Sequence, residues 1–500
     1  MTGRGAVATG ALTLALVGGC TAAGGEADAV VDPELAPLYE QVLSWEPCSP
    51  SSAMECASLT VPRDYERPAE GTRELALYRL APAEPEDGAT EDGADDGAGG
   101  GAVVVLPGGP GGSGQFLLEG LSPFRELAAD RAVVSYDPRG VNASDAVSCE
   151  DDAAFAARQA LDATPDTAPE EAALVAAFEA FADACASAVG DDLAHMGTAD
   201  LVRDLDLLRA ALGEDRLSYL GLSYGSLVGL EYARAFPDRV GRVALDSPMT
   251  AAGRADADRE EVLLARIEET LDGALQACVD APAGCRLGTG VGEARDRVET
   301  LLDELDAAPV EVGGRVLTRE VVVSWLWDTL TWGPESSATA VAALGRASGG
   351  QWGDVALLLG PGDVPGFAAY TAVACSDALV TVADAAAARA AAADLGERFP
   401  VFGETAAWWD VACSGWPVDA ALAVADDVVE HAGEALVVAS TGDPLTPPVA
   451  VDEASRQMGG APVLTYAGAE HVAYWFSDCT RFAVNDFLVD GTLPAVGTCA

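Results

Sequence analysis

The stretch that decides the fold is Leu217-Ser-Tyr-Leu-Gly-Leu-Ser-Tyr-Gly225, an apolar run that leads into a Gly-x-Ser-x-Gly sequence. The run before Gly221 predicts a strand, and the apolar periodicity through Ala235 predicts a helix after it. In a strand-turn-helix of this kind the turn is tight, so small residues must flank the serine. An incidental turn serine is the alternative, but it would not need the strand and helix around it. We therefore expect the hydroxyl of Ser223 to be held above the end of a strand, in the position of a nucleophile.

Strands and helices alternate around this turn. Strands are predicted from apolar runs at residues 102–106, 131–136, 240–245, 435–440 and 463–466. Two less continuous runs, 57–61 and 74–80, are typical of strands at the edge of a sheet, and leucines at helical spacing predict a helix over 199–212. Because strands that alternate with helices form parallel sheets, the predicted fold class is α/β, with a mostly parallel sheet flanked by helices.

The strand pattern stops after Asp246-Ser247-Pro248. Helices are predicted beyond it at residues 260–279, 293–305, 336–359 and 383–395, without a convincing buried strand among them. We therefore expect a large helical cap over residues 249–430, inserted between two parts of the core at 45–248 and 431–500.

A serine nucleophile needs a general base, and the chain has three histidines: His195, His431 and His471. In the α/β-hydrolase arrangement the serine comes first along the chain, then the acid, then the histidine. His195 precedes Ser223, and His431 precedes the strand that carries the candidate acid. His471, in the loop after the strand at 463–466, is therefore the predicted base. A solvated loop residue is the alternative for a lone histidine.

The acid is expected at the end of the strand before the histidine strand. Asp443 lies there, in the loop that leaves strand 435–440. Its carboxylate would accept the Nδ1 proton of His471, fix the tautomer of the ring and stabilise the imidazolium. The alternative is that Asp443 only starts an Asp-Pro turn. Three rival carboxylates lack this place at a strand end: Asp426, Asp427 and Glu470.

A glycine-rich loop follows the strand at 102–106, where residues 107–114 read Pro-Gly-Gly-Pro-Gly-Gly-Ser-Gly. Glycine permits close approach of the backbone, and an oxyanion needs two preorganised N–H donors. We expect one donor from Tyr224, the residue after the nucleophile, and the other from this loop, with Gly109 as the candidate. The loop lacks the Gly-Lys-Ser/Thr ending of a phosphate-binding P-loop.

The N-terminus has the features of a bacterial export signal. Its apolar run, residues 6–17, is shorter than the ~20 residues that span a bilayer. The run ends in Leu16-Val-Gly-Gly-Cys20, which resembles a lipobox. We predict a lipoprotein signal peptide at 1–19, a lipid on Cys20 and a flexible tether at 20–44, and hence an outward-facing lipoprotein of the cell membrane or its released form. An ordinary signal peptide with an incidental cysteine is the alternative.

Charge excludes one class of partner. The formal net charge is −52, while half of the residues are apolar (50%). Nucleic acids need a basic face on the protein, so we expect no nucleic-acid partner. The apolar content predicts a folded chain, apart from an acidic, Gly-rich loop at 84–101 that has almost nothing to bury.

The cysteines also indicate export. There are 11, and ten remain when Cys20 is set aside. An even set after a signal peptide is typical of disulfides, although several connectivities are compatible with the sequence. Pairing of nearest neighbours would join Cys48 with Cys56, Cys149 with Cys185, Cys278 with Cys285, Cys375 with Cys413, and Cys479 with Cys499. No Cys-x-x-Cys or other ligand spacing is present, so neither a metal nor another cofactor is expected.

Several motifs together resemble one family, the tripeptidyl-aminopeptidase-like serine hydrolases of actinobacteria, which are related to prolyl aminopeptidases. The motifs lie at residues 107–114, 137–140 (Asp-Pro-Arg-Gly), 200–209, 221–225, 374–377 (Ala-Cys-Ser-Asp) and 441–447 (Thr-Gly-Asp-Pro-Leu-Thr-Pro). The resemblance covers residues 45–499. It implies an α/β-hydrolase fold and an exported serine peptidase that removes short peptides, tripeptides above all, from the N-termini of its substrates.

Three functions remain open at this point. An aminopeptidase needs a carboxylate that pairs with the substrate α-ammonium group, and Asp377 and Glu404 are candidates in the cap. A carboxylesterase or lipase would use the same triad under an apolar lid. The tryptophans that could line such a lid, or form the core of the cap instead, are Trp325, Trp327, Trp332, Trp408 and Trp409. A lipid-anchored binding protein without activity is the third function, and the intact set of catalytic residue types disfavours it.

Overall fold

The computed structural model describes residues 33–50, 52–82, 101–119, 122–255, 259–359, 364–379, 384–419, 422–431, 433–494 and 497–499. The predicted signal peptide at 1–19 and the predicted lipid-bearing Cys20 lie outside these residues, as does nearly all of the predicted acidic loop at 84–101.

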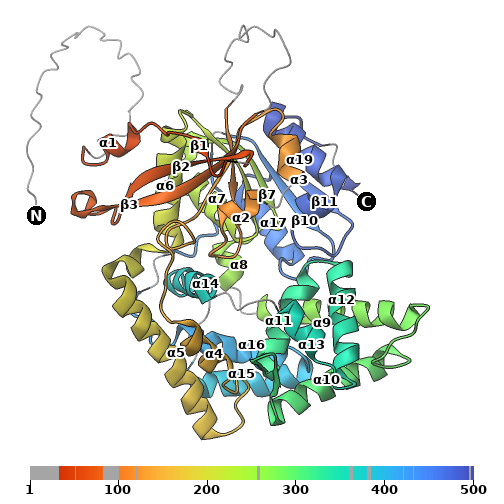
Figure 1. Cartoon of the computed structure of the whole chain (residues 1–500). Coiled ribbons are helices and arrows are strands. Elements are labelled where there is room, and N and C mark those ends of the chain that lie inside the picture. Colours follow the sequence, from red (N-terminus) through yellow and green to blue (C-terminus); the bar gives the residue numbers. More distant parts are fainter. Residues whose placement is uncertain are drawn as a thin grey trace, which may run out of the picture.

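A ten-stranded sheet forms the core, in the order β1-β2-β3-β5-β4-β6-β7-β10-β11-β12 (Figure 1). The strands are β1 (Glu46–Pro47), β2 (Met54–Pro62), β3 (Thr72–Leu80), β4 (Val103–Leu106), β5 (Val133–Tyr136), β6 (Leu217–Leu222), β7 (Val240–Asp246), β10 (Ala435–Ser440), β11 (Val463–Tyr466) and β12 (Thr498–Cys499). From β5 to β12 all neighbours run parallel, whereas β1, β2, β3 and β5 pair antiparallel. The predicted α/β class with a mostly parallel sheet is confirmed.

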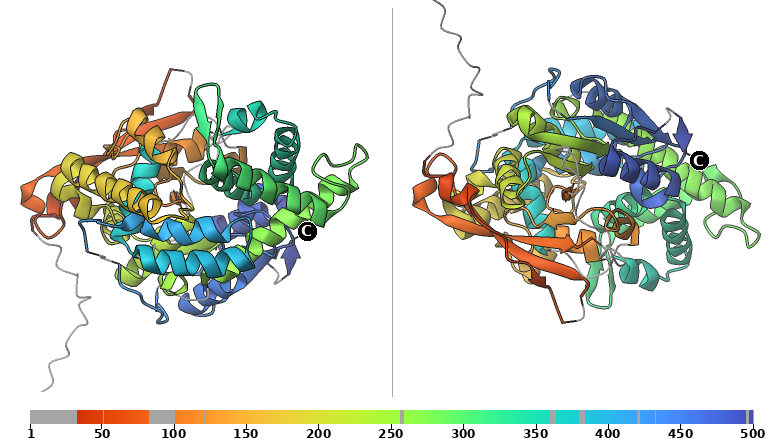
Figure 2. Two further views of the ribbon diagram at one scale, coloured as in Figure 1. Left: turned by 90° about the horizontal axis from the view of Figure 1, so that it is seen from below. Right: turned by 90° about the horizontal axis from the view of Figure 1, so that it is seen from above.

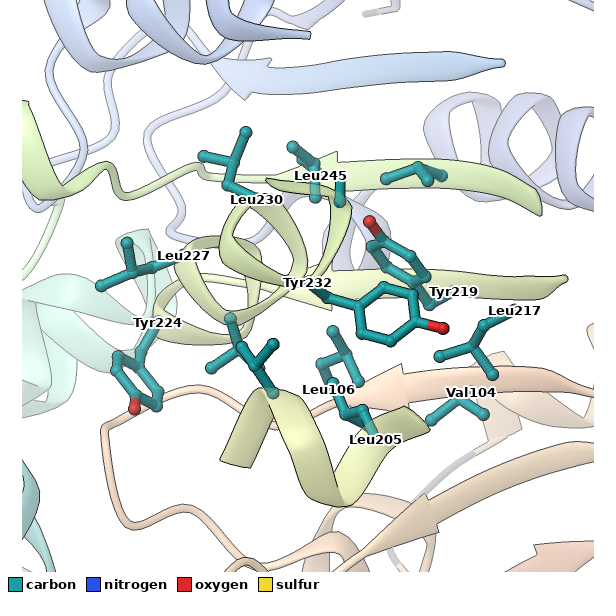
Figure 3. Close-up of a cluster of buried hydrophobic side chains, with 14 of the residues drawn as sticks. Val104, Leu106, Leu205, Leu217, Tyr219, Tyr224, Leu227, Leu230, Tyr232 and Leu245 are labelled. Carbon is teal, nitrogen blue, oxygen red and sulfur yellow. The ribbon is translucent and has the colours of Figure 1, made fainter. Parts of the chain in front are cut away.

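Helices cover both faces of this sheet. They are α1 (Ala36–Tyr39), α2 (Gly114–Glu119), α3 (Ser122–Leu127), α6 (Thr198–Ala211), α7 (Tyr224–Ala235), α17 (Pro448–Gln457), α18 (Ala473–Phe476) and α19 (Asp478–Asp490). Strand β4 shows why both faces need cover: Val104 and Leu106 pack with α6 and α7 (Figure 3), whereas Val103 and Val105 pack with α3 and α19. Burial of each side chain of this size stabilises the fold by about 1.5–3 kcal/mol. Strands buried on both faces are therefore continuous apolar runs, which is why the sequence predicts the central strands well.

The edge of the sheet differs from the prediction. Runs 57–61 and 74–80 were expected as edge strands, but β2 lies between β1 and β3, and β3 lies between β2 and β5. The edge strand is β1, whose two residues, Glu46 and Pro47, carry no alternating pattern. The views in Figure 2 place β2 and β3 at one side of the molecule, away from the C-terminal helices.

The cap is helical and lies beyond one end of the sheet (Figure 1). Its helices are α8 (Ala251–Ala255), α9 (Arg259–Asp280), α10 (Val291–Ala307), α11 (Arg319–Thr331), α12 (Pro334–Ala347), α13 (Gly353–Leu358), α14 (Val364–Ser376), α15 (Ala385–Arg398) and α16 (Gly403–Trp409), with a short hairpin of β8 (Val310–Val312) and β9 (Arg315–Leu317). The single helix predicted over 336–359 is two helices, because Gly349 and Gly350 lie in the turn between them.

Two helices from the first part of the chain pack with the cap as well. Helix α5 (Ala168–Val189) contacts α15 and the segment 410–413 after α16, and α4 (Asp152–Gln159) meets α14 through Phe155 and Phe367. Glu171 of α5 pairs with Arg389 of α15, and Leu174 belongs to the hydrophobic cluster of the cap. By length and composition alone, residues 168–195 could also cross a membrane. The predicted domain boundaries stay a prediction, but this packing groups α4 and α5 with the cap.

The tryptophans of the cap serve mainly its own core. Trp325 and Trp408 are buried in its hydrophobic cluster, and Trp327 meets Trp409 edge-on with ring centroids 5.2 Å apart. Trp332 is the exception, since it is 37% exposed.

Five disulfides link the same pairs that nearest-neighbour pairing predicts. They are Cys48–Cys56, Cys149–Cys185, Cys278–Cys285, Cys375–Cys413 and Cys479–Cys499. Because disulfides persist in oxidising compartments, this set indicates an exported protein.

Candidate active site

Ser223 stands at the sharp turn between β6 and α7, with φ 55° and ψ −119°. This is a strained backbone conformation for a residue other than glycine. A side chain at Gly225 would collide with the carbonyl oxygen of Leu106, and one at Gly221 would lie 2.7 Å from the carbonyl oxygen of Gly225. The two glycines are therefore required by packing, which is the physical basis of the Gly-x-Ser-x-Gly sequence.

His471 and Asp443 form a buried pair. The Nδ1 atom of His471 lies 3.0 and 3.1 Å from the two carboxylate oxygens of Asp443, and the side chains of both residues are almost fully enclosed. Asp443 also accepts the backbone N–H groups of Leu445 and Thr446 and the Thr446 hydroxyl. The structure therefore brings together the acid and the histidine that the sequence predicts.

The surroundings set the pKa values of this pair. Burial raises the pKa of Asp443, but the charge of His471, with its hydrogen bond and those of Thr446 and Ser247, brings this pKa below its usual value. Burial lowers the pKa of His471, and the carboxylate of Asp443 more than offsets it, so the pKa of His471 is raised. Each residue thus stabilises the charged form of the other.

Sequence reasoning missed two residues at the end of β7, Asp246 and Ser247. The Ser247 hydroxyl donates to Asp443 over 2.7 Å and accepts the N–H of Val472 over 2.9 Å. The Asp246 carboxylate accepts the N–H groups of Ala473 (3.2 Å) and Tyr474 (2.7 Å).

The backbone of the same pair reaches the serine. The carbonyl oxygen of Asp246 accepts the N–H of Ser223 over 3.0 Å. Asp246 is fully buried, and this burial raises its pKa to about 6. Asp246 and Ser247 thus contact all three segments that carry Ser223, Asp443 and His471. The available signal was the polar pair at the carboxyl end of a central parallel strand, the edge where ligands bind in α/β sheets.

The glycine-rich loop passes beside Ser223. A side chain at Gly108 would lie 3.3 Å from the Cβ atom of Ser223, and Gly109 has φ 112°, which favours glycine. Tyr224 is the first residue of α7, where backbone N–H groups have no partner within the helix. The oxyanion-hole roles of Gly109 and Tyr224 stay a prediction.

Two cap helices touch the core on either side of this site. The carbonyl oxygen of Thr331, the last residue of α11, accepts the N–H of His471 over 3.2 Å, and the ring of Trp332 lies 6.3 Å from the imidazole. On the other side, Gly111 of the glycine-rich loop lies against the backbone of α14. A side chain added at Gly111 would lie only 2.9 Å from the backbone nitrogen of Tyr370.

The structure places the two predicted ammonium-binding carboxylates differently. Asp377 is 3% exposed, and its oxygens accept the N–H and the hydroxyl of Thr198 at the start of α6. Burial raises the pKa of Asp377 to about 6. Enclosed in this way, Asp377 holds α6 against the cap and is unsuited to bind a substrate. Glu404 is partly exposed on α16 and has Arg319 within 3.9 Å.

The remaining histidines lie in other surroundings. His195 Nδ1 is 3.1 Å from Asp200, and burial lowers the pKa of His431. Within the described residues, no group of three or more His, Cys, Asp and Glu side chains could hold a metal ion.

Comparison with known proteins agrees with this fold. Residues 101–297 match the alpha/beta hydrolase fold family, and residues 399–499 match the family described as TAP-like protein. The chain is 29% identical to tripeptidyl aminopeptidase of Streptomyces lividans over 488 residues, which cover 92% of this chain and 86% of that protein.

Two mycobacterial relatives carry other names. A serine protease of Mycobacterium tuberculosis is 29% identical over 534 residues, 98% of this chain and 96% of the relative. Carboxylesterase B of the same species is 30% identical over 487 residues, 92% of this chain and 90% of the relative. The chain therefore belongs to the TAP-like family of α/β-hydrolases and is a serine hydrolase of that family.

Proposed function

We propose that this protein is an exported serine peptidase that releases short peptides, most readily tripeptides, from substrates with a free N-terminus. Ser223 is the nucleophile, His471 the general base and Asp443 the acid that orients it. The observation that carries the proposal is that the segments of all three residues contact Asp246 and Ser247. These contacts fix the histidine–aspartate pair at the same end of the sheet as the strained serine.

The reaction follows from these positions. Asp443 engages Nδ1 of His471, so Nε2 is the nitrogen that takes the proton of Ser223 as the hydroxyl oxygen attacks the substrate carbonyl. Among the described residues no hydrogen bond joins the Ser223 hydroxyl to His471. Catalytic hydrogen bonds are often long before substrate binds and tighten in the complex, and we expect this one to form there.

The intermediates need two further contributions. The N–H groups of Gly109 and Tyr224 would bind the oxyanion, a contribution of roughly 3–4 kcal/mol for each donor. His471 then returns its proton to the leaving amine, and water, activated by the same base, hydrolyses the acyl-enzyme. No cofactor is required for these steps.

The names of the relatives support peptide substrates and also define the second candidate. One relative is named tripeptidyl aminopeptidase, another serine protease and a third carboxylesterase B. The half-exposed aromatic side chains Trp332 (37%) and Tyr370 (41%), on the two cap helices that reach the core, also favour an apolar acyl group. Carboxylesterase activity with the same triad is therefore the alternative.

The location is part of the proposal. The five disulfides support export. We place the mature protein on the outer side of the cell membrane, held through a lipid on Cys20 after removal of residues 1–19, with peptide or protein N-termini as its substrates.

The first test measures hydrolysis of three substrates by the protein from Ala27 onward: a fluorogenic tripeptide amide, its N-acetylated form and a short-chain acyl ester. Each substrate is also tested with Ser223→Ala. Cleavage of the free tripeptide that depends on Ser223, with little cleavage of the acetylated one, is the expected result. Cleavage of the ester alone would favour the carboxylesterase, and no turnover that depends on Ser223 would leave a binding protein.

A further inference from the structure

One face of α11 carries a row of polar side chains that leads to Trp332, the residue just after the helix. Glu320, Ser324, Asp328 and Trp332 are spaced four residues apart, so they lie along one face of the helix. The opposite face, with Val322, Leu326 and Leu330, is fully buried in the hydrophobic cluster of the cap. The row is held by its own hydrogen bonds: Ser324 donates to Glu320 over 2.7 Å, and the indole N–H of Trp332 donates to Asp328 over 3.1 Å.

This row ends at the catalytic histidine. Trp332 meets the ring of His471 edge-on at 6.3 Å and the ring of Trp475 at 5.7 Å, next to the hydrogen bond between Thr331 and His471. Asp328 is one helical turn away, about 6 Å along the axis. Its carboxylate lies 3.1 Å from the indole nitrogen of Trp332, and that ring lies 6.3 Å from the imidazole. The carboxylate is therefore roughly 10 Å from the imidazole, which is about the span of three extended residues.

The carboxylate of Asp328 is accessible and without a counter-charge. The side chain is exposed to solvent, although burial by the surrounding protein raises its pKa against the hydrogen bond from Trp332, which lowers it. Among the described residues, its one hydrogen-bond donor is Trp332, and no arginine or histidine pairs with it. An ammonium group would supply the opposite charge that such a carboxylate favours.

The other carboxylates of the cap fit this role less well. Asp377 is enclosed by Thr198, and Glu404 has Arg319 nearby. Glu320 starts the same row but lies two further turns from His471, about 18 Å from Trp332 along the axis. One of its oxygens is buried without a partner, and the other accepts Ser324 and Trp409.

We propose that Asp328 binds the α-ammonium group of the substrate, with the Trp332 indole holding its carboxylate in place. The inference rests on the proposed peptidase function and adds to it the residue that selects a free N-terminus and measures the length of the released peptide. The substrate class is a peptide whose first three residues extend along α11 from Asp328 to Ser223.

The test measures kcat and KM of Asp328→Asn with three substrates: the free tripeptide amide, its N-acetylated form and a short-chain acyl ester. For the free tripeptide we expect KM to rise roughly tenfold or more, with kcat little changed, because only the ammonium contact is lost. Values for the acetylated peptide and the ester should stay within about twofold, since neither has an ammonium group. Trp332→Phe, which keeps the ring and removes the N–H, should raise KM for the free tripeptide by a smaller factor.

The matched control is Asp394→Asn, the same substitution on the exposed side of α15, where Asp394 pairs with Arg398. It should leave all three substrates unchanged. Equal losses on the ester and the free tripeptide in Asp328→Asn would mean that Asp328 only supports packing, and an unchanged preference for the free N-terminus would also overturn the proposal. Either result would leave the peptidase function standing, because the wild-type protein tests it. If the wild-type protein does not cleave the free tripeptide, both proposals fall.

Discussion

The sheet edge and the cap contribute to the site in different ways. The edge supplies every group proposed for the chemistry, each within a few residues of the end of β4, β6, β7, β10 or β11. Backbone hydrogen bonds and the glycines of the elbow hold these groups in place. The cap supplies none of the triad and reaches the site through the C-terminal end of α11 and the middle of α14. The difference suggests that chemistry depends on the core, whereas substrate choice depends on the cap.

This division can be tested by substitutions that separate turnover from binding. Changes at the sheet edge should lower kcat for every substrate, because the same acyl transfer is used for esters and peptides. Changes in the cap should instead alter KM and the ranking of substrates.

The largest effect is expected for Asp443→Asn. The amide can still accept the N–H groups of Leu445 and Thr446, so the loop should keep its shape. It would no longer hold His471 in the required tautomer or stabilise the imidazolium, and we expect kcat to fall about 10⁴-fold for peptide and ester alike. Steady-state kinetics with both substrates, and circular dichroism for the fold, check this. A loss confined to the peptide would contradict the division between core and cap.

The second prediction compares one glycine of the core with one of the cap. In Gly225→Ala the new methyl group would collide with the carbonyl oxygen of Leu106, at the start of the glycine-rich loop. We expect the free energy of unfolding to fall by about 1–3 kcal/mol and kcat to fall as the loop is displaced.

The control is Gly273→Ala in α9, where the methyl group would meet nothing within 4 Å. A helix interior favours alanine over glycine by about 1 kcal/mol, so this variant should be slightly more stable and fully active. Urea denaturation of the two variants measures the difference. Similar losses in both would show that the elbow is not specially constrained.

The same difference explains how far sequence reasoning reached. The elbow is local: nine consecutive residues, 217–225, specify a strand, a turn and a helix, and the fold confirms them. The pairing of Asp443 with His471 was predicted because chain order and strand ends restrict the choice. The outermost strand, β1, could not be predicted from the sequence, since it has only two residues and no alternating pattern.

Contacts between segments that are distant in the sequence could not be predicted from local sequence patterns. The roles of Asp246 and Ser247 depend on three segments that meet only in the folded chain, so a polar pair after a strand was not enough to identify them. Asp377 had a motif in its favour, yet its burial against Thr198 depends on how α14 packs on α6. Asp328 has no motif at all, and its interest comes from the position of α11 beside His471.

The third prediction concerns Asp246. Its negative charge is one of the causes that raise the pKa of His471. In Asp246→Asn that pKa should therefore fall, and because the base must be neutral, the acidic limb of the kcat/KM profile should move to lower pH. At neutral pH we expect a loss of roughly 10–100-fold, as weaker acceptors hold the N–H groups of Ala473 and Tyr474.

Ser247→Ala separates position from charge. It removes the hydrogen bonds to Asp443 and Val472 but no charge, so activity should fall while the acidic limb shifts less than in Asp246→Asn. The pH profiles of both variants, measured with the ester, provide the comparison. An unchanged limb in Asp246→Asn would reduce its role to packing.

The smallest effect on chemistry is expected when the disulfide Cys375–Cys413 is removed by substituting both residues with alanine. This link joins the end of α14 to the segment after α16, 38 residues apart, and its loss should lower the free energy of unfolding by about 2–4 kcal/mol. Because α14 meets the glycine-rich loop at Ala369 and Tyr370, away from the helix end that Cys375 anchors, kcat for the ester should remain within about twofold. The KM for the free tripeptide should rise, since α14 and α11 are the two cap helices that touch the core at the site. If ester turnover fell as much as peptide turnover, the cap would have to be counted as part of the catalytic framework, and the separation of chemistry from substrate choice would not hold.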